Sequence, residues 1–456
     1  MEEKTLQKEN IMGTLPVKKL VFVTVWPMVI SMFIQSCYGI VDSMFVAKFS
    51  PDAFIALSLI FPVQILVISL NVGIGVGINA LLARRLGEQR YEEANRVAAH
   101  GYVLYLLLGV LYALFGIFFA RGFMELFSDD AQVIAYGVSY LRIILILGFG
   151  VCLQFAGERM MQATGNPIWN MYIQASGALI NVILDPILIF GLFGFPEMGV
   201  AGAALATVIG QWTGALIGIY LVKKKVRQIH VTLRHFKFDM EIIRPILRVG
   251  VPAMLVQSLA TVMSLSLNKI FSMYSEDYVA VLGAYFRIQN FVYLVVYSLG
   301  NVVIPVVSYN FGARDRTRVE ETIHLCMIIA LVSVCAGGGL LFLIPGKLLS
   351  MFSLTETSMA VGIPAMRIVS VAFVGGGVSL IFSYAFQALN CNRYSLLISL
   401  LRQMIVLLPL AIVLLAVQPI YTWLAFPITE FSCMILAGIL FKSAHKKQIA
   451  TLGEAI

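Results

Sequence analysis

The chain repeats one pattern of landmark residues 225 positions apart, and this repeat constrains the fold more than any other feature. A fixed internal period indicates one structural unit that occurs twice. One register kept over six landmarks is not expected by chance, so we predict two pseudo-symmetric halves. The landmarks are Pro27/Pro252, Gly87/Gly312, Phe127-Ser128/Phe352-Ser353, Gly137/Gly362, Arg142-Ile143/Arg367-Ile368 and Gln162-Ala163/Gln387-Ala388.

The composition places both halves in a membrane. Hydrophobic residues make up 60% of the 456 residues and charged residues 12%, which excludes ordinary soluble domains. Long alternating strands are absent from the sequence, which argues against a β-barrel. We therefore predict an all-α integral membrane protein whose twelve transmembrane helices form two six-helix bundles. The apolar stretches long enough to cross a bilayer are 18–47, 53–83, 94–120, 131–161, 166–192, 199–223, 245–273, 279–310, 317–345, 357–388, 392–417 and 420–442.

The positive charges orient these helices. If the N-terminus is cytoplasmic, the inner segments carry 24 Lys and Arg and the outer loops carry 3. This bias predicts that both termini are cytoplasmic. The net charge of +8 is therefore mainly a topology signal, and we expect the lipid bilayer, not nucleic acid, as the large partner.

A basic connector divides the predicted halves. We predict an N-terminal lobe at 1–223, a cytoplasmic linker at 224–244, a C-terminal lobe at 245–442 and a cytoplasmic tail at 443–456. The six Cys are scattered along the chain without CxxC pairs, so we expect no metal or redox cofactor. A phosphate-binding loop is also missing, which disfavours direct use of ATP.

Matched polar stripes mark the first helix of each half. Ser31, Gln35, Tyr38 and Asp42 are spaced 4, 3, 4, which places them along one helix face. The same spacing recurs in Gln257, Thr261, Ser264 and Asn268. Polar stripes facing lipid are costly, so the stripes should face each other or a watery cavity. Interhelical hydrogen bonds in a closed bundle are the alternative.

Carboxylates deep in the spans carry the chemistry of the first half. Asp42 replaces the amide of Asn268, and Asn181 and Asp185 share one face of the fifth helix. Such carboxylates either retain a proton or share a cation with neutral oxygen ligands. Pairing of an Asp with Arg142 is the structural alternative.

Two further acids have other expected roles. Glu430 has three interpretations: a protonated carboxyl, a partner for Arg402 or Arg367, or a second coupling site. Glu158 is expected near the cytoplasmic end of the fourth helix as an interfacial or gate residue.

Several motifs together resemble the multidrug and toxic compound extrusion (MATE) family over essentially the whole chain. They are GIVDSMFVAKF around Asp42, QATGNP at 162–167, NVILDP at 181–186 and GVAGAALATVIGQ at 199–211. VPAMLVQSLATVMSLSLNKI at 251–270 is similar to the DinF-like branch, which includes MepA-like bacterial drug exporters. The resemblance implies a V-shaped transporter in the bacterial inner membrane that exports cationic lipophilic drugs in exchange for Na⁺ or H⁺.

The resemblance also implies the site residues. Related members bind the coupling cation with residues that match Asp42, Asn181 and Asp185, and Thr207 is the candidate for a further Thr. Gln257 stands where another branch has an acid, so a second cation site is not expected. From members of the polar stripes and nearby aromatic and amide side chains, not from the resemblance, the predicted substrate-binding residues are Gln35, Tyr38, Gln154, Phe155, Gln257, Thr261, Ser264 and Asn268.

Two other function classes compete with drug export. The alternative transporter is a lipid-linked sugar or lipid flippase of the same wider superfamily, which commonly has a more basic cavity. An intramembrane enzyme needs clustered acids at a membrane face or a nucleophile with a base, and neither is visible. We therefore expect no enzyme activity and no cofactor other than the coupling ion Na⁺ or H⁺. The expected substrates are small-molecule organic cations, and the expected oligomeric state is a monomer.

Overall fold

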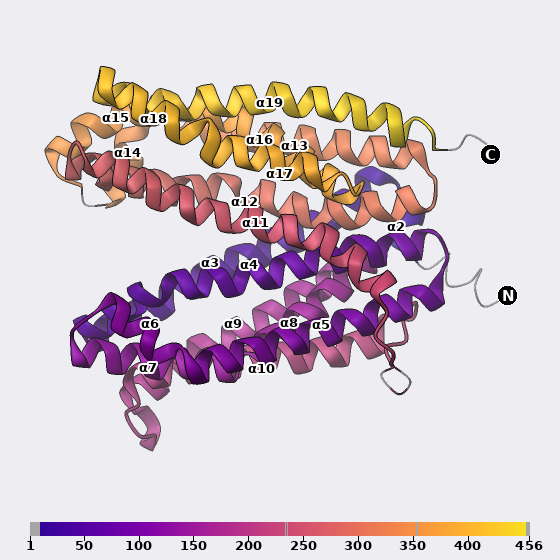
Figure 1. Ribbon diagram of the computed structural model, residues 1–456, viewed down its shortest axis with the longest axis horizontal. Coiled ribbons are helices and arrows are strands. Elements are labelled where there is room, and N and C mark those ends of the chain that lie inside the picture. The colour runs from indigo at the N-terminus through magenta and orange to yellow at the C-terminus, as the bar shows by residue number, and fades with distance from the viewer. Residues whose placement is uncertain (1–9, 233, 235, 353, 453–456) are drawn as a thin grey trace. The chain divides into compact units, whose positions relative to one another are not determined.

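The computed structural model describes residues 10–232, 234, 236–352 and 354–452, and this part of the chain folds into helices without β-strands (Figure 1). Some predicted features lie outside the described residues: residues 1–9 of the first lobe, 233 and 235 of the linker, the Ser353 landmark and 453–456 of the tail.

The two halves contain matching series of helices. The first half contains α2 (Ile11–Thr14), α3 (Val17–Phe49), α4 (Pro51–Gly87), α5 (Tyr91–Phe118), α6 (Ala120–Phe127), α7 (Ala131–Ile146), α8 (Phe149–Ala163), α9 (Pro167–Phe190), the 3-10 helix η1 (Leu192–Gly194) and α10 (Gly199–Lys225). The second contains α11 (Met240–Ser272), α12 (Glu276–Gly312), α13 (Arg316–Leu343), α14 (Pro345–Leu349), the 3-10 helix η2 (Ser350–Phe352), α15 (Glu356–Ser370), α16 (Ala372–Ala388), α17 (Asn392–Leu400), the π-helix η3 (Leu401–Ile405), α18 (Leu407–Val417), the 3-10 helix η4 (Pro419–Leu424), α19 (Ala425–Ala444) and the π-helix η5 (His445–Ile449).

The sequence repeat reappears in the helix boundaries. α4 and α12 begin and end 225 residues apart, and so do α5 and α13. The starts of α4 and α12 are also capped alike, because the Ser50 and Ser275 hydroxyl oxygens accept from the backbone amides of Asp52 and Asp277. A serine cap satisfies amides that the first helical turn leaves without partners. The predicted repeat is therefore confirmed as two copies of one helical arrangement.

Two predicted spans are bent. α7 and α8 meet at 46°, and α15 and α16 meet at 44° at the matching place in the second half. At the first bend, the amides of Gly148 and Gly150 donate to carbonyls three residues back, which tightens the turn and redirects the helix. Ten described helices can cross a bilayer, or up to twelve if each bent pair is one span. The all-α membrane fold is confirmed.

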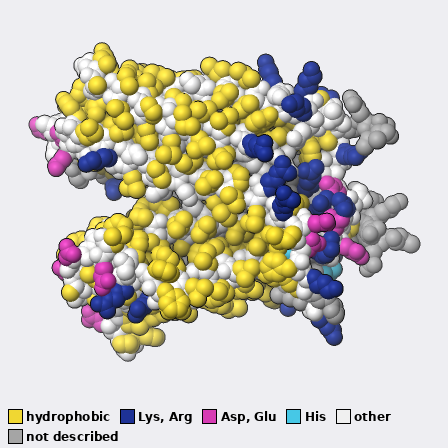
Figure 2. All heavy atoms as spheres, viewed as in Figure 1, with side chains coloured by type: hydrophobic (Ala, Val, Ile, Leu, Met, Phe, Trp, Pro, Cys, Tyr) yellow, Lys and Arg dark blue, Asp and Glu magenta, His cyan; other side chains and the backbone are white. Residues whose placement is uncertain are grey.

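The surface fits a membrane. Figure 2 shows hydrophobic side chains along the helices and charged side chains near the helix ends. Large apolar residues such as Leu179, Leu216 and Ile435 are more than half exposed. Exposed apolar surface on this scale is typical of a lipid-facing protein.

The described chain forms two compact units. Unit 1 contains residues 10–14 and 26–250, and unit 2 contains 15–25 and 251–452. α3 and α11 each run through both units, and each changes unit beside a repeated proline, Pro27 or Pro252.

The connector between α10 and α11 covers 226–239, whereas the sequence placed a linker at 224–244. The bounds differ because Lys223, Lys224 and Lys225 form the last turn of α10, where the helix dipole favours positive charge.

Candidate ion and substrate pocket in unit 1

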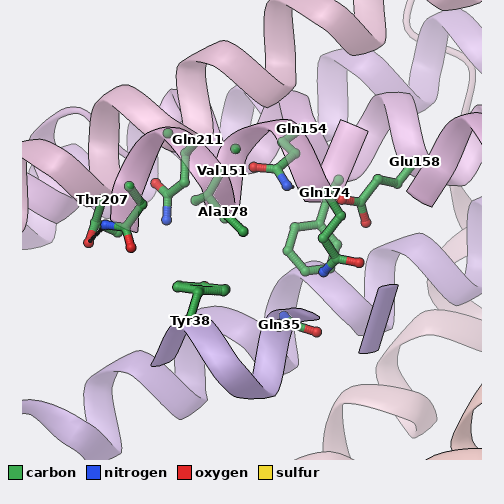
Figure 3. Close-up of a pocket in the computed structure, with 13 residues that line it drawn as sticks. Gln35, Tyr38, Val151, Gln154, Glu158, Gln174, Ala178, Thr207 and Gln211 are labelled. Atoms are coloured by element: carbon green, nitrogen blue, oxygen red, sulfur yellow. Dashed lines mark hydrogen bonds between the residues drawn. The ribbon is translucent and has the colours of Figure 1, made fainter. Parts of the chain in front are cut away.

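A polar pocket lies in unit 1, with α3 on one side and α8, α9 and α10 on the other (Figure 3). In Figure 3, Gln35 and Tyr38 of α3 point toward the side chains of the other three helices. Thr207 lies at one end of the pocket and Glu158 at the other. The lining residues are Gln35, Tyr38, Val151, Gln154, Phe155, Glu158, Gln174, Gly177, Ala178, Asn181, Thr207, Gly210 and Gln211.

Glycines bring α9 and α10 together beside this pocket. A Cβ added at Gly177 would lie 2.8 Å from the Gly210 carbonyl oxygen, and one added at Gly210 would lie 2.6 Å from the Gly177 carbonyl oxygen. Small residues are what allow helices in membranes to approach so closely. The approach brings Asn181 to Thr207: Asn181 Nδ2 donates to Thr207 Oγ1 and to Asp185 Oδ1, each at 3.3 Å. The structure thus gathers three of the predicted cation-site residues.

Aromatic contacts hold the α3 carboxylate near this group. Phe45 packs edge-on against Phe190, the last residue of α9, with 6.3 Å between ring centroids. Phe49 fills the space beside Gly199, where a Cβ would lie 2.5 Å from its ring. This end of α3 is therefore fixed against the ends of α9 and α10. Asp42, the fourth predicted residue, lies near enough to Asp185 for the two carboxylates to interact electrostatically.

The four residues leave buried oxygens without partners. Asp42 is 9% exposed and Asp185 is fully buried. Asp42 Oδ1, Asn181 Oδ1 and Asp185 Oδ2 accept no hydrogen bond. Each unsatisfied buried group costs about 1–3 kcal/mol, so the arrangement favours a bound cation or proton. Within the described residues, no three His, Cys, Asp or Glu side chains form a metal site. Two carboxylates with amide and hydroxyl oxygens suit a hard cation such as Na⁺.

The predicted substrate-binding residues do not all line this pocket. Gln35, Tyr38, Gln154 and Phe155 do, together with Asn181 and Thr207 of the predicted cation site. The other four are on α11 in unit 2 and do not line it; Gln257 is exposed and Thr261, Ser264 and Asn268 are half-buried. A cavity shared by the two polar stripes stays a prediction.

Glu158 is buried in the pocket. The sequence predicts an interfacial or gate residue near the end of this helix, but Glu158 is only 4% exposed and lines the pocket, so the interfacial role is wrong and the gate role stays a prediction. Its Oε1 accepts from Gln154 Nε2 at 3.1 Å. Arg159, counted among the cytoplasmic basic residues, is likewise buried, and its Nη1 donates to Gln162 Oε1 at 2.7 Å.

Sequence reasoning also missed Gln174 and Gln211, which line the pocket. Helical spacing could have found both. Gln174 lies seven residues before Asn181 on α9, and Gln211 lies four residues after Thr207 on α10, so each shares a helix face with a predicted site residue.

The alternative ion pairs are resolved by burial and contact. Arg142 is exposed whereas Asp42 and Asp185 are both buried, so the alternative pairing of an Asp with Arg142 is wrong. Glu430 does pair with Arg402 in unit 2: Arg402 Nε donates to both Glu430 carboxylate oxygens, at 2.7 and 2.8 Å. The pairing interpretation of Glu430 is confirmed.

Comparison with known proteins gives the family. The MatE family matches residues 27–187 and again residues 252–413, two segments that begin 225 residues apart. This chain belongs to the MatE family. The resemblance inferred from the motifs is confirmed, and the family's matching segment occurs once in each half of the repeat.

Named members of the family resemble the chain over most of its length. A multidrug export protein, MepA of Staphylococcus haemolyticus, is 27% identical over 85% of both chains. A probable multidrug resistance protein, YoeA of Bacillus subtilis, is 28% identical over 93% of this chain and 94% of its own. The fold matches a solved multidrug resistance MATE family transporter in its outward-facing conformation, with a TM-score of 0.88, 24% identity and coverage of 100% and 99%.

Proposed function

We propose that this protein is an antiporter that exports cationic lipophilic compounds of many shapes and is driven by a Na⁺ or H⁺ gradient. One observation carries the proposal: Asn181 lines the pocket and also donates a hydrogen bond to the buried carboxylate of Asp185. An ion bound at Asp185 can therefore change, through the Asn181 side chain, the affinity of the pocket for the exported compound. The MatE relatives named as multidrug export and resistance proteins support the same activity.

The exchange follows from charge. A Na⁺ ion would be held by the free oxygens of Asp42, Asn181 and Asp185 with the Thr207 hydroxyl, and a proton would reside on one of the two carboxylates. Either ion neutralises negative charge that attracts a cationic compound in the same low-dielectric unit. Ion binding therefore lowers the affinity for the compound, and the compound lowers the affinity for the ion by the same factor.

The pocket wall suits many organic cations. Tyr38 offers an aromatic face for cations, and Phe155 adds a ring over which the Arg159 guanidinium already lies, 5.6 Å from the centroid. Gln35, Gln154 and Gln174 offer amides that can reorient. Neither the aromatic rings nor the amides require one fixed orientation of the bound compound. Recognition would therefore depend on positive charge and apolar surface more than on shape.

Alternating access would use the bend of α3. Pro27 has no amide hydrogen, so the Val23 carbonyl lacks its helical partner and the helix bends easily there. α3 enters unit 1 at Trp26, directly before this proline. We propose that bending here opens the pocket to one side of the membrane and then the other.

The protein would reside in the bacterial inner membrane as a monomer with both termini cytoplasmic.

The test is efflux from vesicles containing the purified protein, under an imposed Na⁺ or H⁺ gradient, with ethidium as the cationic substrate. Asp185→Asn should abolish gradient-driven efflux, because it removes a charge that the driving ion must neutralise. It should spare much of the equilibrium binding, because Asp42 keeps one of the two negative charges and the pocket wall is unchanged. Asn268→Ala, at the repeat-related position on α11, should cost far less transport. Equal losses in the two variants would place coupling outside unit 1. Transport of a lipid-linked sugar without ethidium efflux would favour the flippase.

A further inference from the structure

The pocket contains a single carboxylate, and it is not one of the two acids assigned to ion coupling. Glu158 is the only acidic side chain among the lining residues, and none of the lining residues is Lys, Arg or His. The rest of the wall is amide, hydroxyl, aromatic or apolar. The charge that a bound compound meets directly is therefore that of Glu158.

Glu158 lies at the end of the pocket opposite Thr207 of the ion site (Figure 3). Figure 3 shows Glu158 with Gln154 and Gln174 at the end of the pocket opposite Thr207. On α9, Gln174 precedes Asn181 by seven residues, which is roughly 10 Å at 1.5 Å per residue. The pocket thus has an end that borders the coupling residues and an end that carries its own carboxylate.

The immediate partners of Glu158 do not neutralise it. Its Oε1 accepts from the neutral amide of Gln154, which lies across Gly214 of α10, where a Cβ would approach the amide carbon to 2.9 Å. The charge of Arg159 acts on Glu158, but this guanidinium donates to Gln162 and packs against Gly75 of α4. No ion pair with Glu158 occurs in the part of the chain that the structure describes. A nearly buried carboxylate with a neutral hydrogen-bond donor favours a cationic ligand in the space beside it.

We propose that Glu158 is the residue that selects cationic substrates, with its carboxylate placed against the positive group of an organic ammonium or phosphonium ion. This proposal rests on the proposed export function and adds to it a division of labour: Glu158 recognises the charge of the exported compound, whereas Asp42 and Asp185 bind the driving ion. Gln35, Gln154 and Gln174 would adapt to the rest of the compound.

The primary test is equilibrium binding of tetraphenylphosphonium to the purified protein, which requires no ion gradient. Glu158→Gln keeps the size and the bond to Gln154 but removes the charge. Because Glu158→Gln removes the Coulomb attraction between the carboxylate and the cation in a low-dielectric site, the dissociation constant should rise roughly ten- to hundredfold. Glu158→Asp should keep part of the affinity. Glu125→Gln, which removes an exposed carboxylate of α6 in the same unit, is the control and should leave binding unchanged.

A second variant separates recognition from a purely structural role. Glu158→Gln combined with Gln174→Glu returns one carboxylate to the same end of the pocket from α9. Binding of the cation should recover at least tenfold relative to Glu158→Gln alone. A structural role for Glu158 would give no such recovery. This comparison also holds if Glu158→Gln lowers the yield of folded protein.

Export assays distinguish an error about the role of Glu158 from an error about the export function itself. Ethidium and a neutral phenanthridine of the same ring system are compared in wild-type and Glu158→Gln vesicles. Selective loss of ethidium export supports the inference. Equal loss of both compounds, or unchanged tetraphenylphosphonium binding, overturns it while export by the wild type still stands. Absence of export by the wild type refutes the function, and the binding data then decide the role of Glu158 alone.

Discussion

Gly210→Ala tests whether the close approach of α9 and α10 creates the ion site. The added Cβ would lie 2.6 Å from the Gly177 carbonyl oxygen, a backbone atom that cannot rotate away. Ordinary contact begins at 3.4 Å, so the two helices must part by roughly 0.8 Å. The Asn181 to Thr207 hydrogen bond is already 3.3 Å long and would exceed hydrogen-bonding distance.

The expected effect is on ion binding more than on folding. Loss of this hydrogen bond is worth about 1 kcal/mol, which raises the ion concentration for half-maximal efflux roughly fivefold. The added methyl group should lower the free energy of unfolding by about 1–3 kcal/mol through overpacking. The higher helix propensity of Ala should restore up to about 1 kcal/mol of this loss. The protein should therefore remain folded with a melting temperature lowered by a few degrees.

The assay is ethidium efflux from vesicles at graded Na⁺ or H⁺ concentrations, with melting temperature measured on the same preparations. Gly283→Ala is the matched control, because a Cβ at this α12 position meets no atom within 4 Å. Gly177→Ala should reproduce the defect from the opposite helix. Wild-type ion dependence in Gly210→Ala, with an unchanged melting temperature, would refute the argument that the glycine contact sets the geometry of the site.

Two further predictions concern unit 2 and the polar stripes. Glu430→Gln leaves the Arg402 guanidinium without its carboxylate in a buried site and should destabilise the protein by about 3–5 kcal/mol, whereas Glu430→Leu with Arg402→Met should restore most of the melting temperature. Equal melting temperatures for the single and double variants would contradict this reasoning. Cysteines placed at Gln35 and Gln257 should react with membrane-impermeant reagents from opposite sides as ion and drug conditions change. Labelling from one side under all conditions would argue against alternating access.

The sequence by itself determined the features that depend on local chemistry. The 225-residue repeat and the apolar spans follow from residue type and spacing, because helix formation and membrane insertion are set within a few turns. Residues four apart on one helix, such as Asn181 and Asp185, could be placed together for the same reason. The motifs around them also led to the family that the comparison shows.

Only the tertiary structure decided which side chains of different helices contact one another. Spacing along α8 could not show that Glu158 is buried and lines the pocket, or that Glu430 pairs with Arg402 and not Arg367. The contact of Asn181 with Thr207 depends on how closely two glycine-bearing helix faces approach. A helical period specifies which side chains share a face, but the partner of that face is set by packing among all the helices of the unit.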